Sequence, residues 1–159
     1  MITTSDVADS KSNTEGAEMG KVIIDAEIIN NDDEGSVARG QLKPNEVRRT
    51  TVKNMLVDTG AMLVSIPEEE IAKLGLRVVR EAVSKYANGQ KSVRKIYGPV
   101  RIKVMGREDH VLVMASHPGM PALLGQLALE GLDLAVDPTR QRLIPGHPEY
   151  PNEQLIEMY

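Results

Sequence analysis

The chain has 159 residues, no cysteine and a net charge of -4 at pH 7. This length fits one domain with a sizeable core, and the lack of thiols excludes disulfide frameworks, thiolate metal sites and cysteine nucleophiles. The acidic balance, without a cluster of Lys and Arg, argues against a nucleic-acid-binding surface. No apolar run is long enough to cross a bilayer and no signal peptide is evident, so we expect a cytoplasmic protein without membrane contact.

Composition divides the chain into three parts. Residues 1–19 are mostly polar and acidic, and we expect them to form a flexible N-terminal tail. Residues 20–146 are expected to form one domain. Residues 147–159 are rich in proline and are expected to form an extended, mobile C-terminal tail.

Strand and helix patterns follow one another in the first half of the domain. Apolar and β-branched residues predict strands over residues 22–29 and 47–57. The polar run 30–35 has the composition of a turn, and its acids are interpreted as an acidic hairpin tip because their spacing does not fit a calcium loop. Pro67, three glutamates in the first turn and a terminal Gly75 predict a short helix.

The second half of the domain contains short strand patterns separated by turns, as in an all-β sandwich or barrel with one or two short helices. Asn88-Gly89 predicts a tight primed turn in a long hairpin over about residues 81–97, whose polar centre indicates that it projects. A strand ending at Gly125 then leads into a short helix over 126–132. A last hairpin is expected from Leu134 to Ile144.

Asp58-Thr59-Gly60-Ala61 is the most informative functional signal. It follows the apolar residues 55–57, which predict that Asp58 lies at the end of a buried strand. An apolar setting shifts the pKa of a carboxyl group, donors orient it, and a glycine leaves room for a substrate, so these residue types suit acid–base chemistry. The motif occurs once in the chain.

The chain resembles the retropepsin-like aspartic proteases in this motif, in the projecting hairpin and in the segment Leu123-Leu124-Gly125. This single-lobed family includes the retroviral proteases, and the resemblance covers about residues 21–145. It implies a closed, barrel-like acid-protease fold with one lobe per chain and a twofold-symmetric homodimer. The implied site residues are the catalytic Asp58; Thr59, Gly60 and Ala61 of its loop; Ala87, Asn88 and Gly89 of a flap over the substrate; and Leu123, Leu124 and Gly125, which support the loop.

The resemblance implies hydrolysis of bonds in a peptide or protein substrate, without a metal or other cofactor. Two carboxylates about 3 Å apart share one proton, so one activates water while the other protonates the scissile carbonyl oxygen. A single Asp58 cannot play both roles at once. A second Asp58 across a twofold axis would supply the pair, and the hairpin from Leu134 to Ile144 is the candidate element for completing the interface.

Two other functional interpretations remain open. A dimer with the same fold could bind a peptide or a partner protein without turnover, and a purely structural β-domain could use Asp58 only to cap a turn. The three histidines, His110, His117 and His147, are widely spaced and the last two precede proline. We therefore expect surface or turn roles for them rather than metal ligation.

Overall fold

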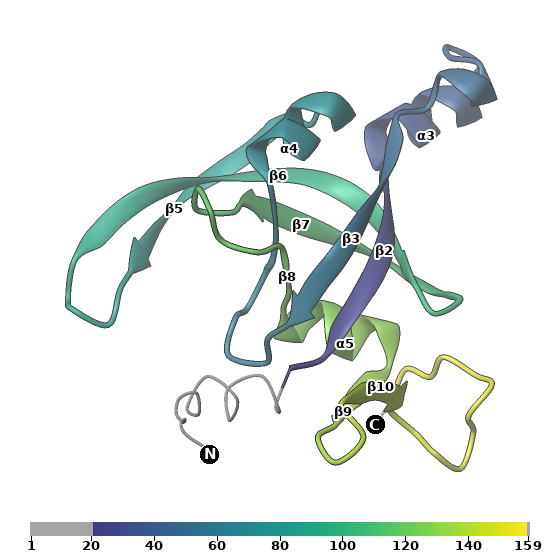
Figure 1. Cartoon of the computed structure of the whole chain (residues 1–159). Helices are drawn as coiled ribbons and strands as arrows, with labels where there is room; N and C mark the ends of the chain where they lie inside the picture. Colours follow the sequence, from purple (N-terminus) through teal and green to yellow (C-terminus); the bar gives the residue numbers. More distant parts are fainter. Residues whose placement is uncertain (1–20, 159) are drawn as a thin grey trace, which may run out of the picture.

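The computed structural model describes residues 21–158, so the flexible tail predicted over residues 1–19 lies outside the described residues. Within this range the chain is mostly β with three short α-helices (Figure 1). The strands are β2 (Ile23–Asn30), β3 (Arg49–Val57), β4 (Val64–Ile66), β5 (Val78–Lys85), β6 (Lys91–Val104), β7 (Arg107–Ala115), β8 (Leu123–Leu124), β9 (Leu134–Asp137) and β10 (Arg142–Pro145). The helices are α3 (Asn31–Ala38), α4 (Glu68–Leu74) and α5 (Gln126–Leu132), with a 3-10 turn at Pro44–Glu46.

Six strands close a ring of hydrogen bonds in the order β2, β3, β8, β4, β7, β6 and back to β2. β5 pairs with β6 and extends the sheet beyond the ring, while β9 and β10 form a separate two-stranded sheet. The prediction of a mostly β domain is confirmed. The described residues contain three helices, where the sequence predicted one or two.

The core fills the inside of the ring. From Ile96 to Val104 along β6, every second residue is buried, so one face of this strand points inward. The core is aliphatic, and the helices add buried residues to it: Ile71 and Leu74 from α4, and Ala128, Leu129 and Leu132 from α5. None of the helices in the described range is long and apolar enough to span a membrane.

The polar run after β2 forms helix α3, so the turn predicted over residues 30–35 is wrong. The Asn30 side chain caps the helix by accepting a hydrogen bond from the Asp33 amide (3.0 Å). Asp32, Asp33 and Glu34 lie in the first turn, where negative charge interacts favourably with the helix dipole. Arginines from three distant parts of the chain pair with these acids, and such long-range pairs are invisible in a local pattern.

The other predicted elements agree well with the structure. β2 and β3 match the strands predicted over residues 22–29 and 47–57. α4 is preceded by Pro67 and ends at Gly75, whose φ of 63° lies in the left-handed region that glycine tolerates. α5 and the β9–β10 hairpin also lie where the sequence predicts them.

The C-terminal segment lies against the domain. Residues 146–158 contain no helix or strand, yet the Leu155 amide donates to Asp133 Oδ2 (2.9 Å). The Gln154 side chain donates to the carbonyl oxygens of Glu108 (2.7 Å) and Gly131 (2.9 Å). The prediction of an extended, mobile tail did not anticipate these contacts.

Candidate functional site

Parallel pairing between β3 and β8 positions the Asp58 loop. The ladder joins Leu56 to Leu123 and Val57 to Leu124, and the Asp58 amide continues it by donating to the Leu124 carbonyl oxygen (3.0 Å). The structure therefore brings the Asp58 segment and the Leu-Leu-Gly segment together. They are separated by more than 60 residues in the sequence, and they meet at the point where β3 ends.

The loop orients the Asp58 carboxylate through its own backbone. The Gly60 amide donates to Asp58 Oδ1 (2.9 Å), and the Ala61 amide donates to the Asp58 carbonyl oxygen (3.1 Å). Asp58 and Ala61 are half-buried, while Thr59 and Gly60 are exposed. The prediction of a buried strand ending in a buried carboxylate is thus wrong for the single chain, because most of β3 is itself exposed or half-buried.

Gly125 occupies a position with no room for a side chain. A Cβ atom there would lie 2.5 Å from the Leu63 carbonyl oxygen and 2.8 Å from that of Ala61. Immediately afterwards, the Gln126 amide donates to the same Ala61 oxygen (2.8 Å), and the Leu127 amide donates to the Met62 oxygen (3.2 Å). The start of α5 therefore fixes the far side of the Asp58 loop, and this close approach requires glycine.

The flap hairpin, β5 and β6 with residues 86–90 between them, projects from the ring (Figure 1). Its tip residues Ala87, Asn88 and Gly89 are exposed. The Gly89 amide donates to the Tyr86 carbonyl oxygen (2.9 Å), and Gly89 alone in this turn has positive φ (86°). The hairpin prediction is confirmed, but the predicted two-residue primed turn at Asn88-Gly89 is wrong, since both primed types need positive φ at the first central residue and Asn88 does not have it.

Positive φ at two successive residues, as in a type I′ turn, occurs instead in the connection between β6 and β7. Met105 and Gly106 connect these strands with φ values of 53° and 77°. Met105 is an unusual residue for this conformation, so composition alone did not indicate it. The exposed Met105 side chain lies outside the core.

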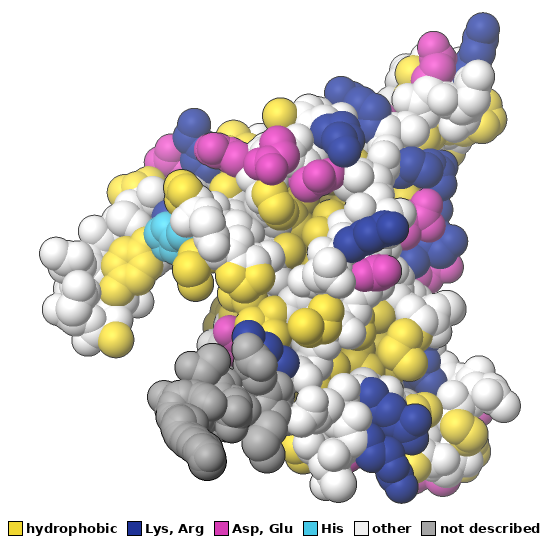
Figure 2. Space-filling view, in the orientation of Figure 1, with side chains coloured by type: hydrophobic (Ala, Val, Ile, Leu, Met, Phe, Trp, Pro, Cys, Tyr) yellow, Lys and Arg dark blue, Asp and Glu magenta, His cyan; other side chains and the backbone are white. Residues whose placement is uncertain are grey.

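A hollow lies between the flap hairpin and the body of the domain (Figure 2). A small cavity of about 110 Å³ is lined there by Leu123, next to the residue that holds Asp58, and by Arg94 and His117. Its remaining walls are largely apolar, including Met114 and Met120. This arrangement can hold a small side chain against Leu123, whose strand pairs with the end of β3.

Tyr86, Arg94 and His117 are site residues that the sequence analysis did not identify. Tyr86 Oη lies 3.2 Å from His117 Nε2, and Arg94 Nη1 lies 3.3 Å from the same atom. Strand alternation could have placed Arg94 on the same face of the hairpin as Ser92. The meeting with His117 depends on the path of the loop after β7, for which the sequence contains no signal.

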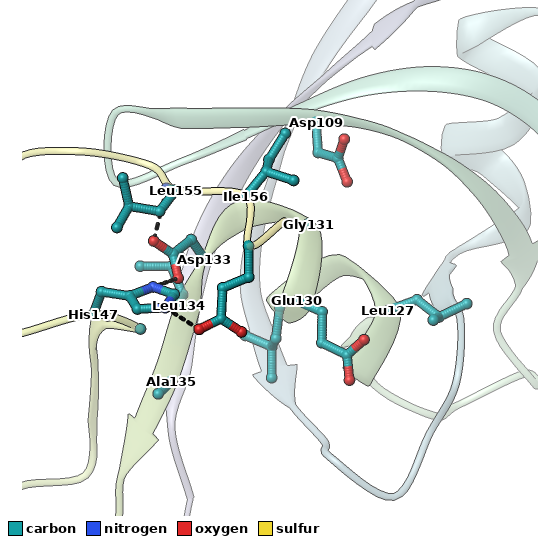
Figure 3. A pocket seen from close by; sticks show the side chains of 13 residues that line it. Asp109, Leu127, Glu130, Gly131, Asp133, Leu134, Ala135, His147, Leu155 and Ile156 are labelled. Carbon is teal, nitrogen blue, oxygen red and sulfur yellow. Dashed lines mark hydrogen bonds and ion pairs between the residues drawn. The ribbon is translucent and has the colours of Figure 1, made fainter. Parts of the chain in front are cut away.

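A second, larger cavity of about 710 Å³ lies beside α5 and β9 (Figure 3). There His147 Nδ1 is 2.8 Å from Asp133 Oδ1, and its Nε2 is 3.2 Å from a Glu157 carboxylate oxygen. Hydrogen bonds to Glu157 and Asp133 raise the pKa of His147 above its usual value. The Leu155 amide, followed by His147 and Arg107, lowers the pKa of Asp133.

Two of the three histidines contact charged side chains of the protein. No group of three or more His, Asp or Glu residues within the described range could hold a metal ion. His147 is engaged by two carboxylates, and His117 faces an arginine. The contacts described for these two histidines are hydrogen bonds and ion pairs within the protein.

Comparison with known proteins identifies the family. Residues 37–131, more than half of the chain, match the family described as "gag-polyprotein putative aspartyl protease". The chain belongs to this family of retropepsin-like aspartyl proteases, and the resemblance predicted from the sequence is confirmed. The matched range includes Asp58, the flap hairpin and Gly125; it ends before β9 and β10.

Two further comparisons complete these findings. Among curated proteins, no match to this chain was found. The solution structure of the simian foamy virus (mac) protease is similar, with 21% sequence identity, coverage of 67% of this chain and 90% of that protein, and a TM-score of 0.41.

Proposed function

We propose that this chain is an aspartic endopeptidase that acts as a homodimer on peptide or protein substrates. The observation that supports this most directly is the single Asp58, held by β8 and α5 in a chain that belongs to an aspartyl protease family. Its half-buried carboxylate has one oxygen bonded to the Gly60 amide. Among the described residues, no partner binds the other oxygen.

In the proposed reaction, Asp58 and its copy across the twofold axis share one proton. The ionised carboxylate removes a proton from water, whose oxygen attacks the carbonyl carbon, while the protonated carboxyl group donates to the carbonyl oxygen. The resulting tetrahedral diol then collapses, the C–N bond breaks and the amine leaves with a proton from the dyad. The products are a carboxylic acid and an amine, and no cofactor takes part.

Two features support the proposed dimer. Thr59 follows Asp58 directly and is exposed, so its hydroxyl could bond across an axis at this loop. The β9–β10 sheet has only two strands, so each strand has an outer edge available to a second copy. This hairpin is our candidate for completing the interface.

The test is cleavage of a mixed peptide library by the full chain at acidic and neutral pH, with products read by mass spectrometry. Asp58→Asn should lower the rate by about 100-fold to 10,000-fold while the protein remains folded, because an acid–base group contributes on that order. Asp32→Asn, at an exposed carboxylate on α3, is the matched control and should cleave normally. A statine-type inhibitor, which imitates the tetrahedral diol, should slow the wild-type enzyme.

The result that would overturn the proposal is a folded wild-type dimer that cleaves nothing at any pH. Such a result, together with retained peptide binding, would support the alternative of a binding module on the same fold. A cleavage rate that is unchanged in Asp58→Asn would show that Asp58 is not a catalytic residue.

A further inference from the structure

The inner face of the flap hairpin is joined to a distant loop by hydrogen bonds. Tyr86 Oη lies 3.1 Å from Ser92 Oγ and 3.2 Å from Nε2 of His117, which is 31 residues later in the chain. The rings of Tyr86 and His117 are 5.7 Å apart between centroids. The tyrosine therefore connects the turn of the hairpin to the loop between β7 and β8.

Arg94 makes the second connection between the hairpin and this loop. Its Nη1 atom lies 3.3 Å from the same Nε2 atom of His117, and its Nη2 atom donates to the Ala115 carbonyl oxygen. On the opposite face of the hairpin, the cross-strand partners Val83 and Val93 are 65% and 64% exposed. The polar contacts thus lie on the face that is turned toward the domain.

The contacts around His117 are compatible with only some protonation states of its imidazole ring. A guanidinium group has donors and no acceptor, so Nε2 accepts from Arg94 only when it carries no proton. Protonation at this atom would place a donor and a positive charge beside the arginine. Glu68 and Glu69 of α4 line a cavity with His117. Arg94 and these two carboxylates are therefore the charged groups near its ring.

We propose that Tyr86, Arg94 and His117 are positioning residues that hold the flap hairpin against the cleft wall, and that this flap latch requires neutral His117. The inference rests on the proposed function, because a flap acts on substrate only if this chain is a protease; Arg94 and His117 line the cavity beside Leu123, which pairs with β3 just before Asp58. The three residues act through the position of the flap and do not touch the reacting atoms. Protonation of His117 removes the acceptor for Arg94 and opens the latch.

The chain contains no cysteine, so two spin labels can be placed at chosen sites. Ala87→Cys lies at the exposed flap tip and Ala72→Cys lies on the exposed side of α4. The distance between the labels is measured in the full chain, in the background of Asp58→Asn to prevent self-cleavage. An excess of unlabelled chain is added so that few dimers carry labels on both subunits. The measured distances are then those within one chain.

We expect a narrow distribution of distances at about pH 8 and a broad one at about pH 5, a range that spans the ordinary titration of histidine. In His117→Ala and in Tyr86→Phe, the distribution of distances should be broad at both pH values. His117→Gln, whose amide oxygen accepts without titrating, should be narrow at both. His110→Gln, at another exposed histidine, is the control and should behave like the unsubstituted chain.

A distribution that is the same at both pH values, or is as narrow in His117→Ala as in the unsubstituted chain, would overturn the latch. In the otherwise native enzyme, Tyr86→Phe should raise KM by about fivefold with little change in kcat, as expected for loss of the hydrogen bond between the hairpin and His117. The distance measurement does not require cleavage. If the label distances respond to pH as expected but the protein cleaves no peptide, the proposed function is wrong and the latch is supported. If the enzyme cleaves peptides but the label distances do not respond to pH, the latch is wrong and the proposed function is unaffected.

Discussion

The amide of Asp58 lies 3.0 Å from the carbonyl oxygen of Leu124, to which it donates a hydrogen bond. Gly125 follows Leu124, and the first amides of α5 then bond back to the carbonyl oxygens of the Asp58 loop. The candidate catalytic carboxylate is therefore positioned by backbone groups from a segment far along the chain. Changes at Gly125 should reach Asp58 through these bonds.

Gly125→Ala should lower both stability and activity. Its Cβ atom would lie within 2.8 Å of three carbonyl oxygens, all of them backbone atoms that cannot swing away as a side chain can. Overpacking of this kind destabilises a protein by about 1–3 kcal/mol. Urea unfolding followed by tryptic digestion measures the first effect, and peptide cleavage measures the second.

Gly35→Ala is the matched control for this glycine substitution. Gly35 lies in α3, and its new Cβ atom would contact only the flexible end of the Arg39 side chain. Because alanine is the better helix former by about 1 kcal/mol, this variant should be as stable as the wild type or more so. Equal stability and equal activity of the two variants would contradict the role assigned to Gly125.

The shared dyad predicts a particular result when active and inactive chains are mixed. Chains carrying Asp58→Asn should form dimers with wild-type chains, and such mixed dimers have only one normal carboxylate. Cleavage per wild-type chain should then fall in proportion to the wild-type fraction, to about half in an equal mixture at statistical exchange. Cleavage assays after overnight exchange measure this dependence.

A matched mixture with Asp32→Asn chains controls for dilution and should leave the rate per wild-type chain unchanged. Sedimentation of the same samples gives the oligomeric state. An active monomer, or a rate that does not respond to added Asp58→Asn chains, would rule out a dyad shared between two chains.

Local sequence patterns predicted the elements that depend on local chemistry. Pro67 and Gly75 mark the ends of α4, and the apolar run before Asp58 marks the end of β3. The short strand before Gly125 was predicted from its apolar residues and its glycine. The sequence alone thus predicted where the Asp58 loop, β8 and the flap hairpin lie along the chain, although it did not show their contacts.

The remaining features depend on residues that meet only in the folded chain. α3 was missed because its acidic first turn is paired with arginines elsewhere, including Arg48 and Arg101. The meeting of Tyr86 with His117 depends in the same way on a loop without regular structure. The exposure of Asp58 was misjudged because an apolar run predicts burial without showing whether neighbouring elements cover the strand.

Asp33→Asn should destabilise the domain through α3. Asp33 is 7% exposed and accepts hydrogen bonds from the backbone amide, Nε and Nη2 of Arg48, the last two at 2.9 Å. These bonds from the Arg48 side chain lower the pKa of Asp33. Loss of the charge should reduce the free energy of unfolding by about 1–3 kcal/mol, measured by urea denaturation at neutral pH.

Asp32→Asn is again the appropriate control, because Asp32 lies on the same helix as Asp33 and forms an exposed pair with Arg77, which follows α4. That change should alter the free energy of unfolding by no more than about 0.5 kcal/mol. Since the pKa of folded Asp33 is lowered, its contribution should be complete above the usual carboxyl pKa and vanish as the pH falls through the lowered value. Equal changes in the free energy of unfolding for Asp33→Asn and Asp32→Asn at neutral pH would contradict this prediction.

The C-terminal segment should be held most firmly in mildly acidic solution. The pKa of His147 is raised by Glu157 and Asp133, so its stabilising effect is complete below about pH 6.5 and is lost as the pH rises through the raised value. The pKa of Asp133 is lowered by the Leu155 amide and then by His147 and Arg107. Its stabilising effect is complete above about pH 3.9 and is lost as the pH falls through the lowered value.

Hydrogen exchange at the Leu155 amide, expressed as a protection factor, reports this effect directly because that amide donates to Asp133 Oδ2. Protection should be highest between about pH 4 and about pH 6.5 and should decrease on either side. In His147→Gln the decrease at high pH should disappear while the decrease at low pH remains, since Asp133 still titrates. His110→Gln should keep both decreases. Constant protection in the wild type between about pH 6 and about pH 9 would show that the charge of His147 does not hold the segment.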